Sequence, residues 1–360
     1  MPYKLITGLI FGLISLYTFT AQAENVYKPA ELVNKAQPHY PDSRITPSNG
    51  SKLPLTGSTG RDVGLVELVF MIGTDGKPYE VFVTRSTSPL FEQEAARAIL
   101  RYEYRPAKIQ NKVVNSKGSA LVTSEFWYKK PFPGIMGAPE GFHSFYNKFT
   151  KELAKSMPDE DRARMFIKKM SHLSDQTYVS LSHIELARFK YATTFGTPHE
   201  AIEALYGILQ FAGIVKHKRA VLEEDFEKKV VKNLIKLLFE NGRSAEVLEL
   251  YTGYLERIPD LSRLYSKTID KTKSLQKSDT VIERKLKLNE RGDAHLPMFK
   301  RLFTIDQVAG SLSPLKLRCD TKFLQLDFKI DAQYALPESW GKCDLQLIGE
   351  PGTTASVLQQ

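Results

Sequence analysis

The stretch Val63–Arg85, VGLVELVFMIGTDGKPYEVFVTR, decides the fold of the first part of the chain. An apolar run, Val63–Ile72, is followed by an Asp75-Gly76 pair and then by Tyr79–Arg85, in which apolar and polar residues alternate. Two β-forming runs joined by Asp-Gly are typical of a β-hairpin with a tight turn. The stretch therefore predicts two neighbouring antiparallel strands.

A helix and a third strand follow this hairpin. Ser88 and Pro89 suit the cap and the first position of a helix, and Pro106 cannot continue it. One helical face carries the apolar residues Phe91, Ala95, Ala98, Ile99 and Tyr102. Alternation returns in Ala120–Tyr128. The order β-β-α-β predicts a small α+β unit with one helix on an antiparallel sheet.

From residue 142 the periodicity becomes helical, after a Pro- and Gly-rich linker over residues 131–141. The predicted helices are Phe142–Phe149, Ala163–Met170, Ile184–Phe195, Ala201–Phe211, Phe226–Phe239 and Val247–Leu255. Two segments, Phe195–Tyr206 and Glu240–Tyr251, share a small turn, an acidic-Ala helix start and a Leu-Tyr pair. This pattern resembles helical-hairpin repeats of the tetratricopeptide kind. An irregular helical bundle over residues 142–278 is the alternative.

Alternation with a period of two marks the C-terminal region, residues 279–360. The predicted strands are Val281–Leu288, Leu315–Cys319, Phe323–Ile330 and Cys343–Ile348, the last taken as the final strand. They indicate a β-sandwich or a small barrel. The chain has two cysteines, Cys319 and Cys343, for which a disulfide is the default in an oxidising compartment. A metal site and two free thiols are the weaker alternatives.

The N-terminus has the features of a secretory signal peptide. Lys4 precedes the apolar run Leu5–Phe19, and Ala21-Gln22-Ala23 follows as a small-x-small cleavage site. The run is short for a transmembrane helix, although a retained membrane anchor stays open. Removal of residues 1–23 takes away only Lys4 and lowers the net charge from +9 to +8. Export makes nucleic acid an unsuitable partner for this basic chain.

The first domain, residues 24–130 with an N-terminal arm, resembles the C-terminal domain of the TonB family over residues of about 37–130. The matching pieces are Gln37–Pro41, Gly64–Phe70, Thr74–Gly76, Val81–Pro89, Phe91–Ala96 and Tyr104–Ala107. They follow the order of the family patterns P-x-Y-P, G-x-V-x-V-x-F-x-V-x-x-D-G, V-x-S-S-P, F-D/E-x-A-A and W-R/K-F/Y-x-P-A, with Tyr102 at the Trp position of the last pattern. The resemblance implies a β-β-α-β fold and a place in the cell envelope.

The resemblance also implies where a partner binds. In the family the free edge of the last strand accepts an extended peptide by strand addition. By this likeness the edge is Ala120–Tyr128, with the Gln37–Pro41 arm beside it. The expected partner-binding residues are Gln37, Pro38, Tyr40, Pro41, Val122, Ser124 and Phe126. The alternative is that both segments are purely structural.

The chain departs from the family's energy transducers in two ways that bear on function. Its N-terminal helix has a cleavage site, and no long Pro-rich spacer follows it. The sequence therefore predicts a periplasmic adaptor or scaffold that binds peptides or envelope proteins, with outer-membrane transporters as candidate partners. The alternative is an inner-membrane-anchored transducer that takes part in outer-membrane transport.

No pattern of residues points to catalysis or to a cofactor. The seven histidines lack metal-ligand spacing, and nucleophile-elbow, P-loop and dinucleotide-binding glycine motifs are missing from the sequence. Acidic pairs such as Glu223-Glu224 suit helix starts. We therefore expect a binding protein with no enzymatic activity, no cofactor and no identifiable small-molecule substrate.

Overall fold

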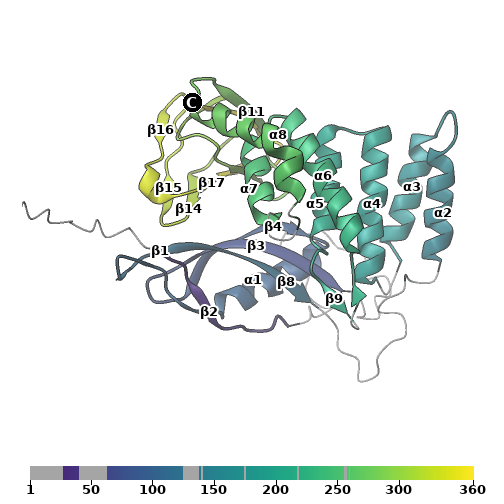
Figure 1. Cartoon of the computed structure of the whole chain (residues 1–360), viewed down its shortest axis with the longest axis horizontal. Coiled ribbons are helices and arrows are strands. Elements are labelled where there is room, and N and C mark those ends of the chain that lie inside the picture. Colours follow the sequence, from purple (N-terminus) through teal and green to yellow (C-terminus); the bar gives the residue numbers. More distant parts are fainter. Residues whose placement is uncertain are drawn as a thin grey trace, which may run out of the picture.

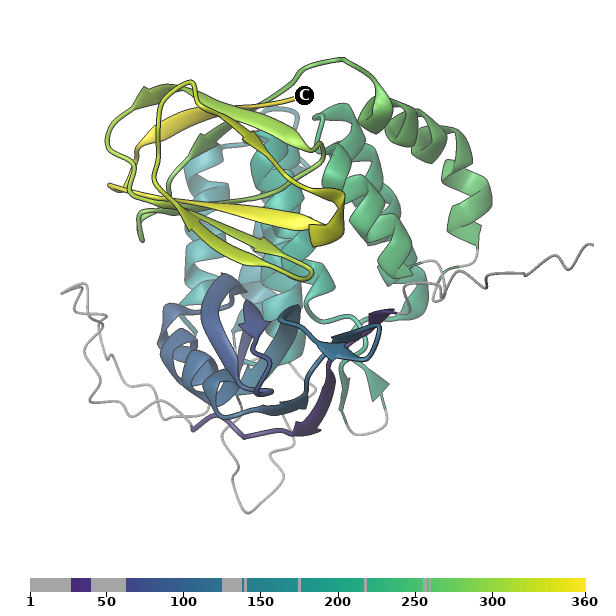
Figure 2. The ribbon, with the colours of Figure 1, turned by 90° about the vertical axis from the view of Figure 1, so that its left-hand side faces the viewer.

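The computed structural model describes residues 27–39, 63–124, 138, 141–173, 176–216, 219–254, 258 and 260–360. This part of the chain is a mixed α+β structure with several small sheets and eight α-helices. Figures 1 and 2 show the hairpin-containing domain at the bottom, with an array of helices and a β-sandwich above it. The predicted signal segment, residues 1–23, lies outside the described residues.

The predicted hairpin and helix are present. The third strand begins at Ser116, before the predicted Ala120, and residues 125–128 of the prediction lie outside the described residues. The sheet has the antiparallel order β4-β3-β8 and one helix. Its elements are β3 (Gly64–Ile72), β4 (Pro78–Ser86), η1 (Pro89–Phe91), α1 (Glu92–Leu100) and β8 (Ser116–Ser124). At the turn Gly76 has φ 79°, and an added Cβ would clash with the carbonyl oxygen of Tyr104. Glycine therefore serves both the turn and its close approach to the chain after α1.

The predicted apolar face of α1 forms the core of this domain. Phe91, Ala95, Ile99 and Tyr102 are buried against β3 and β8. Every second residue of β3 points at this face: Val66, Leu68, Phe70 and Ile72. This is the alternation expected of a strand with one face on a helix.

Short strands surround the domain where the sequence predicted an arm and turns. In one pair β2 (Glu31–Asn34) lies antiparallel to β5 (Glu103–Arg105). A second small sheet joins β1 (Tyr27–Lys28), β6 (Lys108–Ile109) and β7 (Lys112–Val113). The region 24–60 is thus partly β-structure. Local sequence does not reveal this because strands of two to four residues exist only through their partners.

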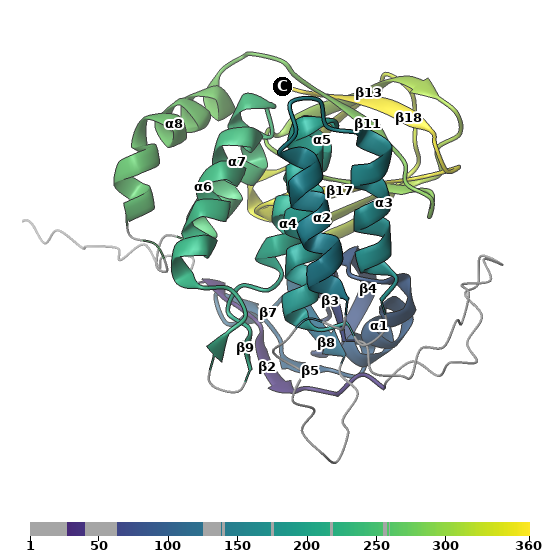
Figure 3. The same cartoon turned by 90° about the vertical axis from the view of Figure 1, so that its right-hand side faces the viewer.

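The helical region lies beside the sheet and extends away from it (Figure 3). Its helices are α2 (Phe142–Leu153), α3 (Glu160–Ser171), α4 (Tyr178–Thr194), α5 (Pro198–Leu209), α6 (Glu224–Glu240), α7 (Ser244–Tyr254) and α8 (Asp260–Lys277). Each helix packs against the next in sequence, which is loosely consistent with helical-hairpin repeats. A short ribbon, β9 (Val215–Lys216) with β10 (Arg219–Ala220), separates α5 from α6 and was not predicted. None of the helices in the described ranges is long and apolar enough to cross a membrane.

The C-terminal region forms two four-stranded antiparallel sheets around one apolar core. One sheet has the order β11-β18-β13-β16 and the other β12-β17-β14-β15. The strands are β11 (Ile282–Lys287), β12 (Asp293–Pro297), β13 (Leu302–Ala309), β14 (Leu315–Cys319), β15 (Phe323–Leu326), β16 (Gln333–Ala335), β17 (Cys343–Ile348) and β18 (Thr354–Gln359).

The predicted disulfide is confirmed. Cys319 of β14 and Cys343 of β17 lie directly opposite each other on neighbouring strands and are bonded. Both are buried. The expectation that Cys343–Ile348 is the final strand was wrong, because β18 follows it and pairs with both β11 and β13. Strand β18 is central in its sheet and buried on most of its residues, so its alternation is weak.

Candidate functional site

The outer edge of β8 presents backbone groups that β3 does not use. The Lys117 N–H points away from β3 and donates to the Asp320 carbonyl oxygen at 3.0 Å. Because backbone direction alternates along an antiparallel strand, Ser119, Leu121 and Thr123 also face outward. In the described part of the chain, the backbone groups of these three residues have no hydrogen-bond partner. This edge is open from Ser119 to Thr123 and closed at Lys117.

Two residues that the sequence assigned to this edge lie on its inner side. Val122 is 1% exposed in the core under α1 and is paired with Val66. Ser124 is paired with Gly64, and the same alternation directs its backbone toward β3. Val122 and Ser124 therefore offer no free backbone groups to an incoming strand. The sequence could identify the strand but not which of its alternate residues face outward.

Of the other predicted partner-binding residues, the structure describes only Gln37 and Pro38. Gln37 and Pro38 lie near the end of α1, where the Arg101 guanidinium donates to the Gln37 carbonyl at 3.0 Å. Tyr40, Pro41 and Phe126 are outside the described residues.

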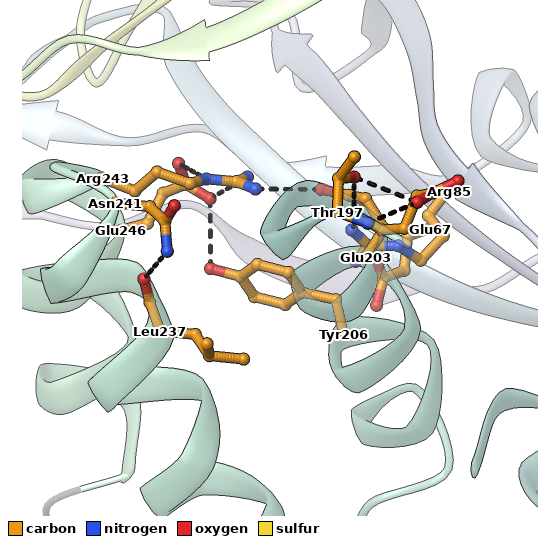
Figure 4. Close-up of polar contacts among 10 residues, drawn as sticks. Glu67, Arg85, Thr197, Glu203, Tyr206, Leu237, Asn241, Arg243 and Glu246 are labelled. Atoms are coloured by element: carbon orange, nitrogen blue, oxygen red, sulfur yellow. Dashed lines mark hydrogen bonds and ion pairs between the residues drawn. The ribbon is translucent and has the colours of Figure 1, made fainter. Parts of the chain in front are cut away.

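The second face of the sheet carries a cluster of charged side chains that bridges to the helices (Figure 4). Arg85 of β4 bonds to Glu203 of α5 at 2.7 Å and lies 3.4 Å from Glu67 of β3. Burial opposes ionisation of Glu203, but the nearby Arg85 and Arg243 outweigh it and hold the pKa of Glu203 below its usual value. For Glu67, burial outweighs Arg85 and raises the pKa.

The same cluster joins the two similar helical turns. Arg243, just before α7, reaches Glu203 at 3.1 Å and Glu246 at 2.6 Å. Tyr206 donates its hydroxyl to Glu246 at 3.2 Å, and its ring lies 4.7 Å from the Arg85 guanidinium and 5.9 Å from that of Arg243. Burial raises the pKa of Tyr206 well above its usual value, so the hydroxyl stays protonated. This arrangement fixes α5 and α7 on the sheet.

The β-sandwich contacts the sheet through a distorted residue of β4. Glu80 has φ 49° and lies where the β3–β4 register shifts, as in a β-bulge. Its carboxylate bonds to Lys316 at 2.8 Å, and its carbonyl accepts from Arg318 at 3.3 Å. The strain at Glu80 is thus held by two cations of β14.

The sheet, the helices and the sandwich line a partly open cavity of about 740 Å³. Its walls include Glu67, Lys117 and Ser119 of the sheet, Glu246 of α7, and Arg284 and His295 of the sandwich. Lys117 bonds to Asp344 at 2.8 Å. Burial lowers the pKa of His295 despite the nearby Asp344, and its Nε2 has no hydrogen-bond partner among the described residues.

No sequence pattern predicted the charged junction, by which we mean the ion pairs that join the sheet to the helices and to the sandwich. The repeated turn pattern, Phe195–Tyr206 and Glu240–Tyr251, contains Glu203, Tyr206 and Glu246, and Arg243 lies in the second turn. The signal therefore existed, but the pattern shows only similar segments and not that they meet on the sheet. Among the described residues no three His, Cys, Asp or Glu side chains gather as a metal site.

The comparison with known families finds a match for the first domain only. Residues 59–124 match the family described as the Gram-negative bacterial TonB protein C-terminal. The match includes β3, β4, α1 and β8, and it is shorter at both ends than the predicted 37–130, so Gln37–Pro41 and Phe126 fall outside it. No curated protein matches the chain. Residues 59–124 are a domain of the TonB C-terminal kind, which indicates a protein of the cell envelope.

Proposed function

We propose that this chain is an exported envelope adaptor that binds an extended peptide of a partner protein along the β8 edge. The observation that carries this proposal is the row of outward backbone groups at Ser119, Leu121 and Thr123, on the last strand of a domain of the TonB kind. Strand addition needs only such a row, because main-chain hydrogen bonds supply the affinity. The role involves no catalysis.

The helical region and the sandwich both contact β8. Leu121 points to the helical side of the sheet and packs with the helical core, while Lys117 is held by Asp320 and Asp344 of the sandwich. An added peptide strand could therefore pair only with the stretch of β8 from Ser119 to Thr123. The helical and β-sandwich regions act as a scaffold that presents the edge and sets where it ends.

Proline at Ser119 tests the strand-addition proposal. Ser119 is exposed and its N–H makes no hydrogen bond among the described residues, so Ser119→Pro should be tolerated while blocking an added strand. Ser119→Thr keeps the N–H and is the matched control. The probe is a bead-bound library of random ten-residue peptides incubated with the purified mature chain.

We expect wild type and Ser119→Thr to retain the same peptides and Ser119→Pro to lose them. Circular dichroism checks that all three proteins are folded. Ala120→Pro serves as a contrast, because Ala120 faces β3 through its pairing with Leu68 and its replacement should unfold the domain. Equal retention by a folded Ser119→Pro would end the proposal, and so would the absence of any retained peptide.

Export with cleavage after Ala23 belongs to the same proposal. The alternative is an anchored energy transducer that takes part in outer-membrane transport, which the family match and the apolar run Leu5–Phe19 also favour. Intact-mass measurement of the protein from its host separates the two. We expect Glu24 at the N-terminus, and full-length protein released only by detergent would establish the anchored form.

A further inference from the structure

The cavity between the three regions has the size of a small-ligand site. Its volume of about 740 Å³ falls within the range of roughly 300–1,000 Å³ found for such sites. Its walls come from strands of the sheet, from α5 and α7, and from β11 and β12 of the sandwich. A ligand there would contact residues from all three regions.

Most charged groups on these walls already neutralise one another. Arg85 pairs with Glu203 at 2.7 Å and Lys117 with Asp344 at 2.8 Å, and Arg291 pairs at 3.1 Å with Glu92, which lies outside the cavity wall. The fourth pair, Arg243 with Glu246, is hydrogen-bonded through two nitrogens of the guanidinium. These pairs hold the regions together, and the exposed Lys287 and Glu249 are wall residues without an ion pair among the described residues.

Arg284 of β11 is different. It is half-buried, yet within the described residues its guanidinium has no ion pair and no hydrogen bond. Burial lowers its pKa, while Glu246 opposes this effect and Arg243 adds to it. The nearby Glu246 is already bonded to Arg243, and a partly desolvated cation without a partner is unfavourable.

The geometry points to a ligand carboxylate as the missing partner: we propose that this cavity binds a carboxylate-bearing ligand through Arg284. A guanidinium matches a carboxylate through two parallel hydrogen bonds. The cavity wall has a second polar group in His295, whose Nε2 makes no hydrogen bond among the described residues and lies 3.7 Å from Asp344. Glu249 also lines the cavity and has no ion pair among the described residues. Its pKa is affected electrostatically by Asp344 and Lys117, and that of Arg284 by Glu246 and Arg243. Glu249 is therefore not the partner of Arg284.

The carboxylate has two possible sources. One is a free organic acid. The other is the C-terminus of a peptide on β8, because Lys117 and Ser119 also line the cavity and a strand antiparallel to β8 would end beside Lys117. The second source rests on the proposed peptide-binding function, and the first does not.

Side-chain NMR tests the proposal on the mature chain labelled with ¹⁵N-arginine. The probes are succinate, citrate, an N-acetylated alternating Val-Thr hexapeptide with a free carboxylate, and the amide of that peptide. The Arg284 Nε–Hε signal is assigned from its loss in Arg284→Gln. We expect a saturable shift of this signal with at least one carboxylate probe.

Isothermal titration calorimetry measures the affinity of every variant, because Arg284→Gln lacks the reporting signal. Arg284→Gln should weaken binding of the carboxylate probe by about tenfold or more, as expected for loss of a charge-assisted pair, and Arg284→Lys should weaken it less. The matched control is Arg263→Gln, the same charge change at an 88% exposed side chain on α8, which should leave binding unchanged. Thermal unfolding verifies that each variant is folded.

Each outcome decides the matter. Binding of succinate or citrate supports a free acid as the source. Binding of the free-carboxylate peptide but not its amide, lost in Ser119→Pro, supports a peptide terminus. Equal binding of peptide and amide, with no binding of succinate or citrate, overturns the carboxylate site while leaving strand addition intact. No shift with any probe, or equal binding by Arg284→Gln, also overturns the site, and the bead library still tests strand addition independently.

Discussion

The two faces of the β4-β3-β8 sheet differ in what they bury. The face under α1 is apolar, with Leu68, Phe70 and Val122 in one core. The opposite face carries Glu67, Arg85 and ion pairs to the helices and the sandwich. The first face makes the domain, and the second face joins the domain to the rest of the chain. Apolar burial on one side of these strands thus stabilises the domain, and ion pairs on the other side connect it to the rest of the chain.

The largest effect is expected on the apolar face. Phe70 is fully buried, so Phe70→Ala should lower the free energy of unfolding by about 3–5 kcal/mol, through lost burial and a cavity. Urea denaturation followed by circular dichroism measures this change. Val69, the neighbouring residue on the charged face, is partly exposed. Val69→Ala should therefore lower the free energy of unfolding distinctly less than Phe70→Ala. Equal costs at Val69 and Phe70 would contradict the division between the faces.

Loss of the disulfide should have the next largest effect on the free energy of unfolding. The bond lies in the β-sandwich, which contacts the charged face of the sheet. Replacing Cys319 and Cys343 with alanine removes a cross-link with a sequence separation of 24 and should cost about 3.5 kcal/mol on the chain-entropy model. Urea denaturation of the purified double variant provides the measurement. In wild type, neither cysteine should react with an alkylating reagent before reduction, and labelling of both in fresh periplasm would refute the bond in the cell.

The contrast between the faces also shows what a sequence can predict. The hairpin, α1 and the apolar core depend on alternation, a turn dipeptide and a helical face, and each of these is readable within a few residues. Helices α2 to α7 were predicted in the same way, whereas α8 was not among the predicted helices. The disulfide followed from the compartment and from the presence of only two cysteines.

The charged junction could not be predicted, because its partners are far apart in the sequence. Arg85 meets Glu203 at a separation of 118 residues, and Lys316 meets Glu80 at 236. No local pattern encodes such pairs. The outward direction of the Ser119 backbone was hidden for another reason. A shift of one residue exchanges the two sides of a strand, and the first part of β8, residues 116–119, has only small and polar residues. The alternation from Ala120 onward shows which residues share a side but not which backbone groups point away from β3.

A smaller effect is expected from breaking the charged face. Arg85→Met leaves Glu203 and Glu67 partly buried without their shared cation and should cost about 1–3 kcal/mol. A double-mutant cycle with Glu203→Gln should give a coupling energy of about 0.5–2 kcal/mol. Urea denaturation of the four proteins measures both values. Strictly additive costs would show that the pair does not stabilise the junction, and Arg263→Met on exposed α8 is the control for loss of one charge.

The smallest effect concerns the pH dependence at His295. Burial lowers its pKa in the folded protein below the ordinary 6.5, so between these two pKa values the unfolded chain binds more protons than the folded one. Stability should therefore fall as the pH drops below about 6.5, by at most about 1.4 kcal/mol per pH unit from one proton.

His295→Gln keeps a polar side chain in the cavity wall and removes this titration. The difference in unfolding free energy between wild type and His295→Gln should shift against wild type from pH 7 to pH 5, as measured by urea denaturation at each pH. Taking the difference cancels the shared titration of Glu67 and Glu249, whose pKa values are raised by burial and which act in the opposite direction. His172→Gln is the control, because His172 is exposed at the end of α3. A constant difference across this pH range would mean that His295 is solvated and that the cavity wall is open to water there.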